Sequence, residues 1–266
     1  MRITLFTILA LLIFSTAEAQ LYVPGETLRY KVSYRAKLFP NTEVAKAEMT
    51  TSESTLDGMP AYRVHGHGQT AKAFNWILPI DDAYTIWVDP ETKRTKRFES
   101  NLHEGDYTFR SIYTFDWFSY NVHTRWQSRQ RPEKFKTMPI SARSMDALSL
   151  YFNLRDVPDE QITDGYACDL EMILEDTIRT LRFRYDGREV RKIKNLGRFN
   201  TIKFRCTIAT SDGESFKDGT EFEVWISDDR NKIPLYVMTP IKVGSICAYL
   251  YEYEGLRFPL DSFIKK

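Results

Sequence analysis

A strict alternation of apolar and polar residues constrains this chain more than any other feature. The segment 28–37, from Leu28 to Lys37, alternates between the two classes at every position. Successive side chains of a β-strand point to opposite faces, so this pattern predicts a strand with one buried and one solvated face. Further strand patterns recur at 61–65, 84–88, 107–115, 167–174, 179–185, 199–209, 220–227, 233–239 and 245–253. The chain is therefore expected to be mainly β, with antiparallel sheets.

One segment has helical signals instead. Residues 144–155 begin with a candidate cap, Ser144, carry an acid in the first turn, Asp146, and end with a base, Arg155. Pro158 prevents continuation. The preceding segment 127–141, which is charged and contains two prolines, is expected to be a loop. The sequence thus predicts two curved antiparallel meanders, arranged as a sandwich or an open barrel, with one short helix near the middle of the chain that packs against the sheet or plugs it.

Length and a weak internal repeat bear on domain organisation. Single all-β domains commonly reach about 200–250 residues, so residues 20–266 are expected to form one β-rich domain. Trp87-Val88-Asp89 aligns with Trp225-Ile226-Ser227, which suggests two pseudo-repeated halves, 22–126 and 162–257, joined by the loop and helix. Chance alignment of alternating strands would give a similar match.

The segment 167–185 allows a more detailed prediction. A hairpin that turns at Asp176-Thr177 would place Leu170 opposite Phe183 and Asp169 opposite Arg184. This register gives one apolar ladder and one ladder of opposite charges, and both stabilise cross-strand pairs.

The N-terminal segment has the features of a secretory signal peptide. An early Arg2 precedes an apolar run at 3–14, which is shorter than the roughly 20 residues of a membrane-spanning helix. Ala17 and Ala19 form the small-residue pattern that signal peptidase cleaves. We therefore expect residues 1–19 to be removed and Gln20 to begin an exported, soluble protein, periplasmic or secreted. The residue directly after the cleavage site is Gln20 and not cysteine, so a lipoprotein is not expected.

Charge and cysteine usage restrict partners and redox chemistry. The chain has 37 Lys and Arg against 36 Asp and Glu, so its net charge gives no reason to expect nucleic acid as a partner. For an exported protein, the classes of partner to consider are envelope lipids, glycans and proteins. In an oxidising compartment any two of Cys168, Cys206 and Cys247 could pair, and three buried free thiols fit the apolar context equally well.

Few residues are candidates for chemistry, and no motif for a cofactor is present. His65 and His67 are spaced to share a face of a strand and are candidate metal ligands. Trp76 in an aromatic segment, Asp82 near it, and Asp146 are candidate ligand-binding residues. Adjacent Asp81 and Asp82 are expected to point to opposite faces of a strand, so they are not expected to act as a catalytic pair.

Several blocks of this sequence together follow the pattern of a known family. These blocks are Tyr22 to Tyr34, Trp87 to Thr92, Asp146 to Tyr151 with Arg155, Trp225 to Pro234, and Gly244 to Ile246. In them the chain resembles the bacterial exported family "domain of unknown function 3108". The resemblance implies an envelope or periplasmic location, and it transfers no catalytic residue because the family has no established activity.

Three functions follow as hypotheses. The first is a non-catalytic envelope protein that binds or carries an apolar or glycan ligand in the concave face of the sheet, in line with the 14% aromatic content. The second is a hydrolase of envelope glycan that uses carboxylates such as Asp82 or Asp146. The third is a structural or assembly partner without a small ligand.

Overall fold

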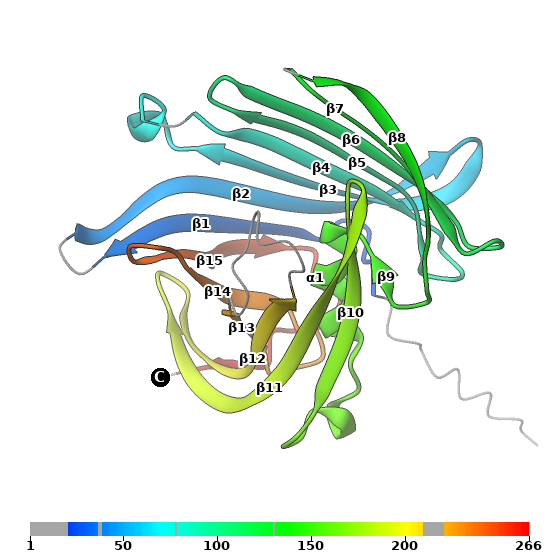
Figure 1. The fold of residues 1–266 in the computed structure, drawn as a ribbon. Coiled ribbons are helices and arrows are strands. Elements are labelled where there is room, and N and C mark those ends of the chain that lie inside the picture. Colours follow the sequence, from blue (N-terminus) through cyan, green and yellow to red (C-terminus); the bar gives the residue numbers. More distant parts are fainter. Residues whose placement is uncertain (1–20, 37–38, 78, 130, 210–220, 266) are drawn as a thin grey trace, which may run out of the picture.

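The computed structural model describes residues 21–36, 39–77, 79–129, 131–209 and 221–265, and the predicted signal peptide lies outside them. A single 16-stranded sheet contains all the strands of these segments. It is strongly curved and wraps around the one α-helix, α1 (Ala147–Asp156) (Figure 1). Two short 3-10 helices, η1 (Lys72–Phe74) and η2 (Asp159–Gln161), lie in connections between strands. No helix in the described segments combines the length and apolar character of a membrane span.

The sheet consists of two sequential meanders. The first contains β1 (Thr27–Ala36), β2 (Phe39–Leu56), β3 (Met59–Thr70), β4 (Asp81–Val88), β5 (Thr95–Glu104), β6 (Tyr107–Asp116), β7 (Asn121–Ser128) and β8 (Arg131–Pro139). The second contains β10 (Ala167–Leu174), β11 (Thr177–Ile193), β12 (Gly197–Ala209), β13 (Glu221–Ser227), β14 (Pro234–Pro240) and β15 (Ser245–Glu254). Two short strands, β9 (Ser144–Met145) and β16 (Phe263–Ile264), pair with β10 and β12.

The two meanders join where β1 pairs with β15, and the sheet runs from β8 at one end to β9 at the other without closing. In Figure 1 the first meander forms the upper arm of the curve, the second forms the lower arm, and α1 lies between them. The prediction of two curved antiparallel meanders with one central helix is confirmed, in its open-barrel form. The two predicted halves fall in the two meanders. That the halves arose as a repeat stays a prediction.

The expected loop at 127–141 is wrong for most of its length, because β8 occupies Arg131–Pro139. Both prolines, Pro132 and Pro139, lie in this strand. Proline lacks the N–H that a central strand must donate, but an edge strand leaves one side unpaired. Since β8 is the outermost strand of the upper arm, it tolerates both residues.

The helix begins later than predicted. Asp146, rather than Ser144, is its N-cap, and its carboxylate accepts hydrogen bonds from the backbone N–H groups of Leu148 and Ser149 at 2.9 Å each. Ser144 belongs instead to β9, where its hydroxyl donates to Glu171. The free N–H groups at the start of a helix favour a carboxylate there, which explains the choice of cap.

The predicted hairpin forms as β10 and β11, but its register is shifted by two residues. Leu170 lies opposite Leu181, and Asp169 pairs with Arg182 at 2.6 Å, because the turn is tight at Glu175 and Asp176. A shift of two leaves every side chain on its predicted face, since strand side chains alternate with period two. The face to which each side chain of β10 and β11 points is therefore as predicted, whereas its cross-strand partner is not.

A buried ion pair fixes α1 within the curve. The guanidinium of Arg155 holds the carboxylate of Glu26 through two bonds, of 2.6 and 2.9 Å, and its Nε donates to the carbonyl of Asn231 at 3.0 Å. The side chains of Arg155 and Glu26 are 6% and 2% exposed. Three of the blocks that carry the family resemblance thus meet at one point.

All three cysteines are free thiols, and those of Cys206 and Cys247 are buried. Burial raises the pKa of the Cys206 thiol well above its usual range. Such a thiol is a poor nucleophile, which agrees with a role in packing.

Candidate ligand pocket

A cavity of about 460 Å³ lies inside the curve, between the two arms of the sheet and α1. The upper arm contributes Tyr30, Ala47, Glu48, Met49, Gly66, His67, Gly68, Asp82 and Tyr84. The helix contributes Ala147, Leu148, Leu150, Tyr151 and Leu154. The lower arm contributes Phe183, Phe222, Val224, Pro234, Val237 and Ala248. Most of these side chains are apolar, so the cavity is suited to an apolar ligand.

Small residues on β2 and β3 create the space. Gly66 and Gly68 lie on the concave face of β3, beside Met49 and Ala47 of β2. A β-carbon at Gly66 would lie 3.3 Å from Leu148 of the helix, whereas one at Gly68 would have no atom nearer than 4.0 Å. Neither glycine has a positive φ, so no backbone strain requires glycine here. Glycine within a strand often marks a place where another group approaches closely.

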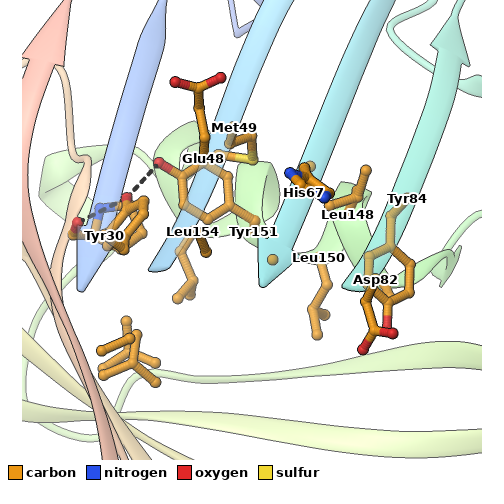
Figure 2. Close-up of a pocket in the computed structure, with 18 of the residues that line it drawn as sticks. Tyr30, Glu48, Met49, His67, Asp82, Tyr84, Leu148, Leu150, Tyr151 and Leu154 are labelled. Atoms are coloured by element: carbon orange, nitrogen blue, oxygen red, sulfur yellow. Dashed lines mark hydrogen bonds between the residues drawn. The ribbon is translucent and has the colours of Figure 1, made fainter. Parts of the chain in front are cut away.

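One side of α1 forms the apolar wall. Leu148, Leu150, Tyr151 and Leu154 follow the spacing of a helical stripe and line the cavity (Figure 2). Phe152 points elsewhere and is fully buried, with its ring 4.4 Å from the ring of Tyr22. Because Phe152 and the Arg155 ion pair anchor the helix from other sides, α1 does not collapse onto the glycines.

Two tyrosine hydroxyls form the polar group at one side of the cavity. The hydroxyl of Tyr30 donates to the carbonyl of Pro234 at 3.0 Å and lies 3.3 Å from the hydroxyl of Tyr151 (Figure 2). Burial raises the pKa of both tyrosines far above their usual range. Both hydroxyls therefore stay neutral.

Asp82 lies at the opposite side of the cavity, beside Tyr84 (Figure 2). It is on the concave face of β4 opposite Gly68, and its carboxylate accepts a hydrogen bond from the backbone N–H of His103 at 3.0 Å. Burial raises the pKa of Asp82 and outweighs this hydrogen bond. Of the candidate residues predicted from sequence, Asp82 is the one whose side chain faces the cavity.

The two histidines occupy the convex face of β3. His65 Nδ1 lies 2.9 Å from Oγ1 of Thr85, and His67 Nε2 lies 2.6 Å from Oδ1 of Asp81. They share a face of β3, as predicted. His67 borders the cavity, but its side chain lies on the face of the strand opposite to Gly66 and Gly68. Across the described segments, no group of three or more potential metal ligands gathers. Metal binding by the pair stays a prediction.

Trp76 and Asp146 lie away from the cavity. Trp76 is 82% exposed in the connection between β3 and β4, and its indole N–H donates to the carbonyl of Ala73. Asp146 is fully buried as the helix cap, and the hydroxyl of Thr95 donates to it at 2.7 Å. Their proposed part in ligand binding therefore has no support from the cavity geometry.

The residues that sequence reasoning missed are Gly66 and Gly68. Their signal was present, because the run His65-Gly66-His67-Gly68 alternates glycine with a larger residue along a strand. The two glycines share one face of the strand and leave that face without side chains.

None of the curated proteins compared with the chain matches it. Among solved structures, the crystal structure of a beta-barrel-like protein of domain of unknown function DUF1849 from Brucella abortus is similar, with a TM-score of 0.57 and 9% identity. The match covers 88% of this chain and 98% of that one, and at this identity it shows the fold alone. The family model "Protein of unknown function (DUF3108)" matches residues 29–251, which is most of the chain. The chain therefore belongs to the DUF3108 family of proteins of unknown function.

Proposed function

We propose that this protein is an exported, non-catalytic binding or carrier protein that holds an apolar ligand between α1 and the sheet. The observation that carries the proposal is the apolar cavity of about 460 Å³. Protein interiors are close-packed and leave few voids larger than a water molecule. Ligand pockets, in contrast, occupy about 300–1,000 Å³ and are mostly apolar with few polar groups.

The lining favours an apolar ligand over a glycan. A sugar needs several hydrogen-bonding partners, whereas the inward polar side chains here are Tyr30, Tyr151, Tyr84 and Asp82. The two tyrosines Tyr30 and Tyr151 already bond to each other or to Pro234. Among the partner classes left by export, a lipid-like molecule fits best.

A glycan hydrolase has less support. Its carboxylates would have to face one substrate, but Asp82 faces the cavity and Asp146 is occupied as the cap of α1. A role as an assembly partner without a small ligand does not account for a hollow interior.

Filling the cavity tests the proposal. Gly68→Leu places an apolar side chain into open space, and we expect it to weaken binding of the apolar fluorescent probe N-phenylnaphthylamine by more than tenfold. The same change should raise the free energy of unfolding by about 0.5–2 kcal/mol, as cavity-filling substitutions commonly do. Fluorescence titration and urea unfolding measure the two effects.

Gln69→Leu is the matched control, because Gln69 neighbours Gly68 on the convex face and is exposed. It should bind the probe as the unmodified protein does. No probe binding by the unmodified protein, or equal binding by Gly68→Leu, would contradict the proposal.

Export is tested separately. We expect the protein produced in a bacterium with its own N-terminus to be recovered from the periplasm, beginning at Gln20 by N-terminal sequencing. Ala19→Arg should retain residues 1–19, since the peptidase needs a small residue there, while Glu18→Ala should be processed. Recovery of unprocessed protein from the cytoplasm would refute export.

A further inference from the structure

The charge on the cavity wall is asymmetric. Three of its lining residues are ionisable acids or histidine: Glu48, His67 and Asp82. Glu48 pairs with Arg29 at 2.6 Å and His67 with Asp81, both on the convex face. Among the described residues that line the cavity, Asp82 alone presents its charge to it, and none is a Lys or Arg.

Asp82 has a second carboxyl beside it, and the charged group that acts in its favour is the imidazole of His103 rather than a Lys or Arg. Glu104, at the end of β5, lies near the carboxyl of Asp82, and partial burial followed by the charge of Asp82 raises the pKa of Glu104. Within the described segments, no Lys, Arg or His forms an ion pair with Asp82 or Glu104, although ion pairs are frequent elsewhere on the sheet. Two carboxyls held close together repel each other when both are ionised, so a cation bound beside them would be stabilised.

An aromatic ring completes this end of the cavity. Tyr84 lies beside Asp82 on β4 and lines the cavity (Figure 2). Burial, together with the charges of Asp82 and Glu104, raises the pKa of Tyr84 to about 12, so its ring stays neutral. The face of a tyrosine ring attracts a cation, and it does so most where water is partly excluded.

The cavity indicates that a ligand binds, and the acidic end of the cavity indicates that the ligand carries a positive charge. We propose that the ligand is an amphiphile with an apolar chain, held between α1 and the sheet, and a cationic amine head, held by Asp82 and Tyr84. This inference rests on the proposed binding function and adds the class of ligand. A fatty acid or another anionic amphiphile would place its charge against Asp82 and Glu104 and is disfavoured.

Three amphiphiles with the same chain and different heads test the inference: decylamine, decanol and decanoate. Each is titrated below its critical micelle concentration at neutral pH, against the protein loaded with N-phenylnaphthylamine. We expect decylamine to displace the probe at about tenfold lower concentration than decanol, as for a partly screened ion pair. Decanoate should be the weakest of the three.

Adjacent aspartates supply the variant and its control. Asp82→Asn should weaken displacement by decylamine and so bring decylamine and decanol to within about twofold of each other. Asp81→Asn alters a carboxylate one residue away on the convex face and should preserve the tenfold preference. A melting temperature for Asp82→Asn close to that of the unmodified protein shows that the fold is intact, since the amide keeps an oxygen that can accept from the backbone N–H of His103.

The outcomes separate the two proposals. Failure of every compound and of the probe to bind refutes the binding function itself. Displacement by all three compounds at similar concentrations, or best by decanoate, leaves the binding function standing and overturns the cationic head. An unchanged preference in Asp82→Asn overturns the assignment to that residue.

Discussion

Replacing Arg155 with alanine is expected to lower the free energy of unfolding by about 3–5 kcal/mol, because it leaves the carboxylate of Glu26 buried without a partner. The change also removes the bond to the carbonyl of Asn231 and frees α1 from the connection that precedes β14. Urea unfolding followed by circular dichroism measures the loss.

Two variants distinguish burial from charge pairing. Asp169 and Arg182 form a two-bond ion pair of the same chemistry on the surface, so Arg182→Ala should have a far smaller effect. Glu26→Leu combined with Arg155→Met should recover most of the stability, since an apolar pair avoids an uncompensated charge. A loss below about 1 kcal/mol for Arg155→Ala would contradict the anchoring role.

Replacing Asp146 with alanine is the second large change, with an expected loss of about 2–4 kcal/mol. Loss of an N-cap costs about 0.5–2 kcal/mol. Here the hydroxyls of Thr95 and Ser149 also lose their shared acceptor in a buried position, which adds about 1–3 kcal/mol. Chemical denaturation measures the sum.

Asp146→Asn keeps an oxygen that accepts the two helical N–H groups, so it should cost much less than Asp146→Ala. Because Asp146 does not line the cavity, Asp146→Asn should also leave probe binding unchanged. A folded Asp146→Asn protein that had lost the probe would restore Asp146 as a ligand-binding residue.

Both predictions follow from contacts that join distant segments, and such contacts mark the limit of what could be predicted from sequence. The blocks around Glu26, Arg155 and Asn231 carry the family resemblance, but local patterns place only Arg155, at the end of the predicted helix. Their meeting in one buried cluster depends on how the sheet curves around α1.

Alternation in the sequence is enough to predict ten of the strands, their faces and the presence of one helix, whereas β2, β5, β7 and β8 were not predicted. These properties depend on local periodicity, and period two is robust enough that a register error of two in β10 and β11 left every face correct. It also determined that Asp81 and Asp82 point to opposite sides of a strand.

The face of β3 that borders the cavity, and the residues that lie across the cavity from it, follow from the three-dimensional fold. Alternation distinguishes two faces but does not say that the glycine face of β3 is the hollow one, or that Leu148 and Val237 lie opposite. Those neighbours come from both arms of the sheet and the helix, and long-range curvature sets their positions. For that reason the strands with clear alternation could be predicted from the sequence, whereas the pocket that the sheet encloses could not.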